Sequence, residues 1–149
     1  MTGINVVAGK LALVAALTDE LPDCTVGYSY VGKVHAGARD YVYLGTSTEA
    51  EVALAAFRND SGRYRRQEEA PVEVCINITR KGESTVEASE VRATEVGALI
   101  EDYLASNPTL GVPGLLIAKI FGFKLNSTAD DDGTYTNLDY SVLFQSDLT

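Results

Sequence analysis

The stretch of sequence that decides the fold runs from residue 64 to residue 105 and reads YRRQEEAPVEVCINITRKGESTVEASEVRATEVGALIEDYLA. Apolar residues alternate with other residues over Val72–Thr79, which is the pattern of a strand with one buried face. After a Lys-Gly turn, apolar residues return at the spacing of an amphipathic helix. With the apolar run Leu115–Leu125 behind them, the strand and helix predict a βαβ crossover as the core unit.

The predicted helix carries a start signal and a stop signal. Ser84 and Glu87 form an S-x-x-E capping box, whose side chains can satisfy backbone N–H groups of the first turn. Asn107-Pro108 ends the helix, because the residue before proline is disfavoured in the α region. Gly97 costs about 1 kcal/mol relative to alanine inside a helix, so we expect close packing on a sheet there. The apolar stripe consists of Val96, Leu99, Ile100, Tyr103 and Leu104.

Four further segments are predicted on the N-terminal side. The apolar run Ile4–Leu17 predicts a helix that packs on the sheet and ends near Leu21-Pro22. Alternation over Thr25–Tyr30 and the run Tyr41–Leu44 predict two strands. The segment Glu49–Phe57 fits a strand or a short helix, and we favour the strand. The expected stripe of the first helix is Ile4, Val7, Leu11, Val14 and Leu17.

The C-terminal part predicts a hairpin. Alternation over Asn137–Phe144 indicates a strand that pairs with the preceding apolar run. An acidic turn, Asp130-Asp131-Asp132-Gly133, separates the two strands. An EF-hand needs alternating ligands and a later glutamate at fixed spacing, so we interpret the turn as solvated and not as a calcium site. In the first strand of the hairpin, the residues expected on one face are Leu115, Ile117, Phe121, Phe123 and Leu125.

Length and composition predict a single domain over residues 1–149. The chain has 46% hydrophobic and 22% charged residues, as an ordinary soluble globular protein does. Its net charge of −9 disfavours binding of nucleic acid or anionic membranes by the whole surface. The N-terminal apolar run lacks the features of a signal peptide and is shorter than the roughly 20 residues of a membrane span. We expect Cys24 and Cys75 to be reduced thiols.

These patterns together predict an α/β protein of the α+β type. We expect a mixed, mainly antiparallel sheet with two helices packed on it, plus a protruding β-hairpin loop. The loop is Arg58–Glu69, which is polar and has turn composition. It is either a solvated loop or an interaction loop, since arginine favours bidentate contacts with acidic partners. The candidate interaction residues are Arg58, Arg63, Arg65, Arg66, Glu68 and Glu69.

No constellation for catalysis is visible in the sequence. It contains one histidine, His35, and two distant cysteines, and it lacks the common nucleotide-binding, hydrolase and zinc-binding motifs. Adjacent carboxylates such as Glu101-Asp102 fall on polar surfaces, whereas acid–base pairs need environments that separate their pKa values. We therefore predict no catalytic, cofactor-binding or metal site, and we do not expect an enzyme.

The chain resembles the tail terminator, or tail-completion, proteins of long-tailed bacteriophages, over roughly Asp40 to Gln145. The order of a helix, several strands, a charged hairpin, a strand, a capped helix and a final hairpin carries part of this resemblance. The matching residues are Tyr41-Val42-Tyr43-Leu44-Gly45, Arg65-Arg66-Gln67-Glu68-Glu69, Glu90-Val91-Arg92, Ile100-Glu101-Asp102-Tyr103-Leu104, Asn107-Pro108-Thr109-Leu110-Gly111 and the closing strand Asn137–Phe144.

The resemblance implies a small α/β virion protein that forms a homo-oligomeric ring, with a hexamer as the expected state. Such a ring caps the major tail tube protein, stops tube polymerisation and presents a surface to the head connector. DNA passes through its lumen without specific binding. The location would be the head-proximal end of the tail. On this basis Asp130, Asp131 and Asp132 either face the lumen and repel DNA or lie in solvent.

Two other interpretations remain open from the sequence. The first is another neck protein, such as a head–tail joining or head-completion protein. The second is a free-standing ligand-binding or enzymatic α/β domain, which would require a deep pocket with polar groups at perturbed pKa. The tyrosines that could line such a pocket are Tyr28, Tyr30, Tyr41 and Tyr43.

Overall fold

The computed structural model describes residues 5–30, 39–46, 48–49, 51–56, 65–82 and 85–147. Within these residues it contains two helices and six strands. Their bounds are α1 Val6–Glu20, β1 Thr25–Gly27, β2 Arg39–Leu44, β3 Glu51–Ala56, β4 Arg65–Lys81, α2 Val86–Ser106, β5 Leu115–Asp130 and β6 Gly133–Asp147. The predicted α+β class, with two helices on a mixed and mainly antiparallel sheet, is confirmed.

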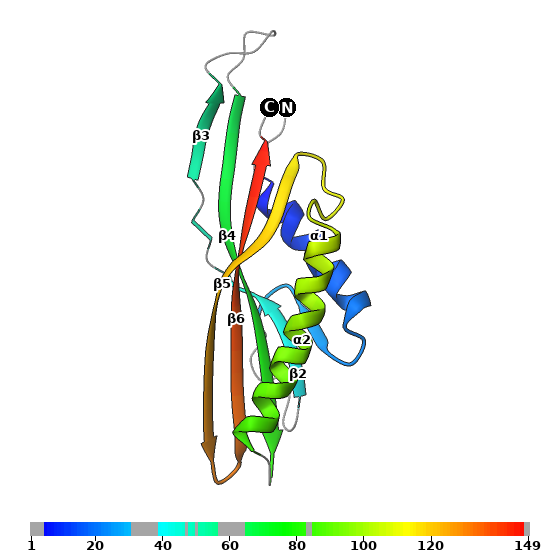
Figure 1. The fold of residues 1–149 in the computed structure, drawn as a ribbon, viewed down its shortest axis with the longest axis vertical. Coiled ribbons are helices and arrows are strands. Elements are labelled where there is room, and N and C mark those ends of the chain that lie inside the picture. Colours follow the sequence, from blue (N-terminus) through cyan, green and yellow to red (C-terminus); the bar gives the residue numbers. More distant parts are fainter. Residues whose placement is uncertain are drawn as a thin grey trace.

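The six strands form one elongated sheet (Figure 1). The strand order is β1-β2-β4-β6-β5, and β3 pairs with β4 off this path. Only the β1–β2 pair is parallel among the described strands. Because β4 has 17 residues, it accommodates β3 and β2 one after the other along the same side. The predicted strand over Glu49–Phe57 is confirmed as β3.

The predicted βαβ crossover is present with one difference. Strands β4 and β5 are both antiparallel to β6, so they are parallel to each other, and α2 connects them. However, β6 lies between them in the sheet. The reason is the short turn at Asp131-Asp132, which returns the chain directly from β5 into the central position. Such short connections join neighbouring antiparallel strands.

Both helices cover the same face of the sheet (Figure 1). Val74 and Ile76 of β4 and Val142 and Phe144 of β6 lie beneath them and are fully buried. Gly97 of α2 lies directly against the Tyr140 ring, so the close helix-to-sheet packing expected at this glycine is confirmed.

Helix α1 makes a similar close approach to the sheet. A Cβ at Gly9 would lie 2.6 and 2.8 Å from two carbons of the Phe144 ring. The helix ends at Glu20 as predicted, but its buried face was predicted wrongly. Val6, Leu13 and Leu17 are buried, whereas Val7 and Leu11 are exposed. The run is apolar all round, so its period does not decide which face is buried.

The start of α2 also differs from the prediction. Its N-cap is Thr85, whose hydroxyl oxygen accepts a hydrogen bond from the Ala88 N–H at 3.1 Å. The capping box at Ser84 and Glu87 was therefore wrong in register, and Ser84 itself lies outside the described residues. In the predicted stripe, Leu99 is an exception because it is 46% exposed. The stop at Asn107-Pro108 is confirmed.

The predicted face of β5 is partly correct. Two irregularities, between Leu115 and Ile117 and between Ile120 and Gly122, each shift the pairing register against β6. The first places Ile117 on the face opposite to Leu115, and the second returns Phe123 and Leu125 to the face of Leu115. Leu115 is buried, whereas Phe121 and Phe123, further along the strand, are exposed.

Candidate interaction surfaces

The C-terminal part of the charged segment Arg58–Glu69 is a strand. Its last five residues, from Arg65 to Glu69, belong to β4 and pair with β3, so the prediction of a loop was wrong for them. An extended strand forms because β3 offers backbone partners that turn composition does not reveal. Arg58 and Arg63 lie outside the described residues.

The charged residues at the start of β4 differ in exposure. Arg66 and Glu69 are exposed, and Gln145 of β6 donates a hydrogen bond to the Glu69 carboxylate at 3.2 Å. Glu68 is fully buried, and its carboxylate accepts from the Asn5 N–H at 3.3 Å. Negative charge is favourable at this position because Asn5 is the N-cap of α1. Glu68 therefore supports α1, and only Arg66 and Glu69 are available to a partner among the described side chains of this group.

The acidic turn between β5 and β6 is exposed at all three aspartates. The Asp130 carboxylate accepts from the N–H groups of Asp132 and Gly133, at 2.8 and 3.1 Å, and so closes the turn on itself. Nowhere in the described part of the chain do three His, Cys, Asp or Glu side chains gather in a way that could hold a metal ion.

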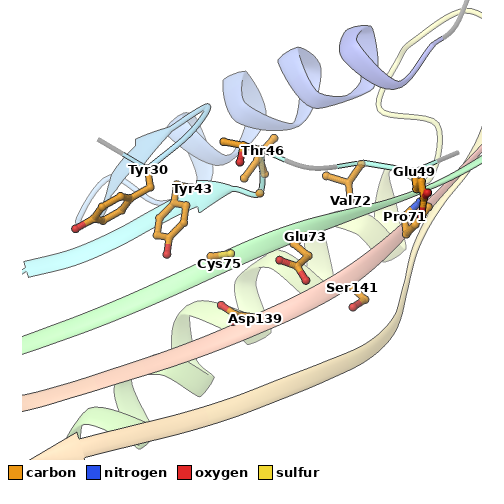
Figure 2. Close-up of a pocket in the computed structure, with 12 residues that line it drawn as sticks. Tyr30, Tyr43, Thr46, Glu49, Pro71, Val72, Glu73, Cys75, Asp139 and Ser141 are labelled. Atoms are coloured by element: carbon orange, nitrogen blue, oxygen red, sulfur yellow. The ribbon is translucent and has the colours of Figure 1, made fainter. Parts of the chain in front are cut away.

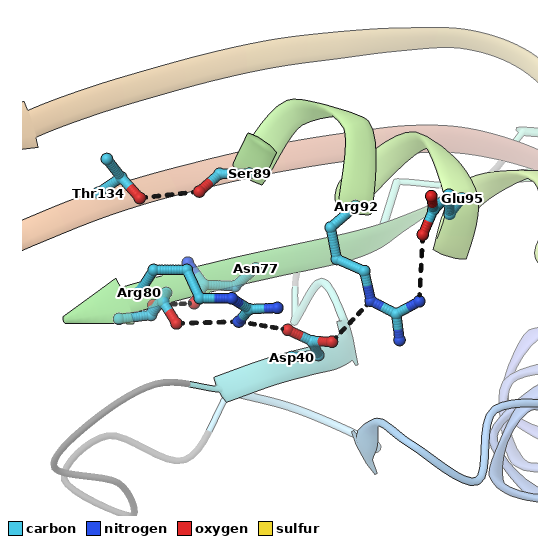
Figure 3. A network of polar contacts seen from close by, with 8 residues as sticks. Asp40, Asn77, Arg80, Ser89, Arg92, Glu95 and Thr134 are labelled. Carbon is cyan, nitrogen blue, oxygen red and sulfur yellow. Dashed lines mark hydrogen bonds and ion pairs between the residues drawn. The ribbon is translucent and has the colours of Figure 1, made fainter. Parts of the chain in front are cut away.

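Figure 3 shows a charged cluster that connects three elements. Asp40 of β2 accepts from Arg80 of β4 at 2.6 Å and from Arg92 of α2 at 2.8 Å. Burial alone would raise the pKa of the Asp40 carboxyl, but the hydrogen bonds from both arginines lower it below its ordinary value. Arg92 also reaches Glu95, one turn further along α2. The Glu90-Val91-Arg92 segment of the resemblance thus contributes a structural ion pair.

A groove of about 610 Å³ lies on the sheet face opposite the helices (Figure 2). Tyr43, Cys75 and Asp139 are neighbours across β2, β4 and β6 and line this groove. Burial and then Asp139 raise the pKa of the Cys75 thiol to about 12, and burial and then Cys75 raise the pKa of Tyr43 to about 12. Both groups are therefore neutral at physiological pH, and the thiol is not activated as a nucleophile.

Two of the four tyrosines considered as pocket residues line this groove, namely Tyr30 and Tyr43. Tyr41 is buried, and its hydroxyl donates to the Ser29 carbonyl at 3.0 Å. Tyr28 lies elsewhere, beneath the Lys10 ammonium at 4.5 Å. The rings of Tyr30, Tyr41 and Tyr43 pack on one another, with centroids 5.2–6.3 Å apart, but the four tyrosines do not line one pocket.

The most unusual surfaces are two apolar ones that the sequence patterns did not reveal. On the outer face of α1, Val7 is 48% exposed and Leu11 is 57% exposed. At the edge of the sheet, Phe121 is 57% exposed and Phe123 is 70% exposed. Leu125, on the same strand, is also exposed. Contiguous exposed apolar side chains on a soluble domain mark sites of protein contact.

These two surfaces lie on different elements. The α1 outer face is Val7, Ala8, Leu11 and Ala15, and the β5 edge is Phe121, Phe123 and Leu125. One signal for the first was present in the sequence, because Val6–Leu17 contains a single charged residue, Lys10. That side chain is buried and donates to the Gly45 carbonyl at 3.1 Å. The outer face of α1 therefore carries no charge until Asp19.

Neither described helix is long and apolar enough to cross a membrane.

No protein-family model matches the chain, and no curated protein matches it. The chain is similar to a chain of a solved structure described as "Virion of native gene transfer agent (GTA) particle", with 19% sequence identity and a TM-score of 0.49. The similarity covers 95% of this chain and 91% of that chain. At this identity and TM-score it establishes neither a family nor a function, so any functional proposal rests on the residues of the chain itself.

Proposed function

We propose that the protein is a structural component of a tailed phage or phage-like virion, and more narrowly a tail terminator. In this role it assembles as a ring, with six copies as the expected number, on the last ring of the tail tube. It stops tube polymerisation there and presents a surface to the head connector. The role is not enzymatic.

The observation that carries the proposal is the pair of uncovered apolar surfaces. The α1 outer face and the β5 edge lie on different elements, and each exposes large apolar side chains in a single copy, as sites of protein contact do. A ring requires two different contact surfaces on each subunit, because its interfaces are heterologous. The resemblance of the sequence to tail terminators is the reason for proposing a ring that ends the tail tube.

The charged surfaces fit this role as further contacts. Arg66 and Glu69 lie on the outer part of β4, beside β3, where they can dock on a neighbouring subunit or on the tube. The exposed turn Asp130–Asp132 is our candidate for a surface that faces the lumen. Carboxylates there would repel DNA phosphates and allow the DNA to pass without binding.

The experiment that tests the function is deletion of the gene for this protein from the particle that encodes it, followed by measurement of tail length by electron microscopy. We expect overlong tails without heads, and we expect tails of normal length when the protein is supplied in trans. Tails of normal length that lack heads after deletion would contradict termination and favour a head–tail joining protein. Unchanged, infectious particles would contradict a virion role altogether.

A charge reversal tests the proposed docking residues separately. Arg66→Glu with Glu69→Lys should impair the trans complementation, because both exposed charges change sign. The matched control is Lys81→Glu with Glu87→Lys, which also reverses one exposed positive and one exposed negative charge, and which lies away from Arg66 and Glu69. Normal tail length with the variant at Arg66 and Glu69 would refute the docking role without affecting the proposed ring.

A further inference from the structure

We propose that neighbouring copies of this chain join head to tail, with the α1 outer face of one copy seated against the β5 edge and the adjoining groove of the next. The proposal deepens the proposed function, on which its ring geometry rests, by naming the two surfaces of the subunit contact. It follows from the position, the shape and the charge of the two surfaces.

The first reason is that α1 exposes an apolar side in a single copy, although its other side packs on the sheet. Leu13 and Leu17 pack into the core, yet the opposite side of the same helix consists of Val7, Ala8, Leu11 and Ala15. A helix that is apolar on all sides is normally buried on all sides. The apolar side chains on the outer face of α1 therefore remain exposed to solvent in a single copy.

The second reason is that the β5 edge offers a surface of matching shape. An apolar groove of about 310 Å³ runs between the end of α2 and the first half of β5, where Leu104, Pro108 and Ile120 line it. Phe123 and Leu125 pair across from Tyr140 and Leu138 of β6, so they continue this surface on the helix-bearing face of the sheet. Apolar helices commonly bind in grooves of this kind.

The third reason is position. The strand order places β5 at one edge of the sheet, whereas α1 lies across the sheet, with Gly9 against Phe144 of β6 and with contacts to β1 at the other edge. The outer face of α1 therefore points away from the sheet, while the β5 edge borders it. A copy that uses both surfaces in this way contacts two different neighbours. This is the condition for a ring or a filament, as opposed to a closed dimer.

The fourth reason is charge. From Leu115 to Ala129, β5 contains Lys119 and Lys124 and no acidic residue, in a chain of net charge −9. The exposed side of α1 ends in Asp19 and Glu20. Contact of β5 with a second β5 would bring lysines together, whereas contact with α1 brings lysine to carboxylate.

Cross-linking of single-cysteine variants tests this contact. Leu11→Cys and Phe123→Cys are made separately in a Cys24→Ser background, because Cys24 is partly exposed and Cys75 is buried. The two purified proteins are treated with a short bismaleimide, alone and as a mixture. We expect a covalent dimer in the mixture and none above the Cys24→Ser background in either variant alone. A protein with both substitutions should give a ladder of multimers.

Three results would overturn the proposal. Cross-linking of either variant alone would show a two-fold contact. Cross-linking of Phe123→Cys with Val52→Cys, on the exposed β3 strand, in preference to Leu11→Cys would show a strand-to-strand contact. Absence of product in every mixture would show that copies do not meet through these surfaces. A cross-link between Leu11→Cys and Phe123→Cys, together with normal tail length after gene deletion, would support the subunit contact and refute the terminator function. Overlong tails after gene deletion without any cross-link would support the terminator function and refute this contact.

Discussion

Strands β5 and β6 are neighbours of almost equal length, but they use their apolar residues differently. Strand β6 has 15 residues, and every second one from Thr134 to Ser146 is buried beneath the helices. Strand β5 has 16 residues and exposes Phe121 and Phe123, two of the four phenylalanines of the chain. The apolar side chains of β6 stabilise the subunit, whereas those of β5 are left for contact with a partner.

The difference arises from position and register. Strand β6 lies between two neighbours and keeps a regular register with β4 over its whole length. Strand β5 lies at the edge, and its two irregularities interrupt the alternation. Irregularities of this kind are frequent at sheet edges, where an exposed strand would otherwise pair indiscriminately. Apolar content alone therefore does not separate core from interface in this molecule.

The largest expected effect on stability separates the buried Phe144 of β6 from the exposed Phe123 of β5. Phe144→Ala in β6 should lower the free energy of unfolding by about 3–5 kcal/mol, because it leaves a cavity beneath Gly9 of α1. Phe123→Ala in β5 should change it by about 0.5 kcal/mol or less in the dissociated protein. Urea denaturation at several protein concentrations measures both values. Equal losses would show that Phe123 also belongs to the core.

The next effect tests the ion pairs that hold β2 to β4 and α2. Asp40→Asn should lower the free energy of unfolding by roughly 1–3 kcal/mol near neutral pH, since two charge-assisted hydrogen bonds are weakened. The pKa of Asp40 is lowered in the folded protein, so this stabilisation is present above the unfolded pKa of about 4. It is lost as pH falls through the lower folded pKa.

Denaturation curves of both proteins from neutral to acidic pH check this linkage. The gap between wild type and Asp40→Asn should narrow below about pH 4. A gap that widens there would contradict the assigned direction of the shift. Glu95→Gln is the matched control, because Glu95 is exposed and lies 3.5 Å from Arg92, and it should have little effect at any pH.

An effect of comparable size concerns the packing of α2 on β6. Alanine is the better helix former by about 1 kcal/mol, yet Gly97→Ala should lower stability by roughly 1–3 kcal/mol, because the new methyl group meets the Tyr140 ring and hydroxyl. Removal of the hydroxyl by Tyr140→Phe should recover part of the loss. A double-mutant cycle measures this coupling. Additive effects of the two substitutions would refute the contact as the cause.

The smallest expected effect on folding is that of a polar substitution at Phe123 in β5. Phe123→Ser should leave the unfolding of dissociated protein within about 0.5 kcal/mol of wild type. It should nevertheless weaken self-association, since a large aromatic contact is lost. Sedimentation velocity over a concentration series measures the association. Val52→Ser on β3 is the control, because Val52 is also an exposed apolar residue, and it should associate as wild type does.

Much of the fold could be predicted from sequence where pattern and position agree. Alternation in Val72–Thr79 and Asn137–Phe144 reports burial correctly, because both strands lie in the regular centre of the sheet. The β5 face was predicted correctly for Leu115, Phe123 and Leu125 but not for Ile117, because the irregularities leave no clear signature in the apolar pattern. The strand character of Arg65–Glu69 was missed because it depends on pairing with β3, a tertiary effect that local composition does not contain.

The candidate site was less accessible to sequence reasoning than the fold. Charged residues were selected as interaction residues, yet Glu68 proved to be buried at the start of α1. The surfaces that now carry the proposals are apolar, and their residues had been assigned to the core. Val7, Leu11 and Phe123 satisfy an amphipathic or alternating pattern equally well in a core or in an interface. Only their exposure in the folded subunit distinguishes these roles.

The measurement that tests the central claim most directly is the solution mass of the purified protein by light scattering over a range of concentrations. We predict association to a defined oligomer, with a mass near that of six protomers at high concentration, and a shift to smaller species for Phe123→Ser. A monomer at every concentration would contradict the claim that the α1 outer face and the β5 edge of neighbouring copies cover each other.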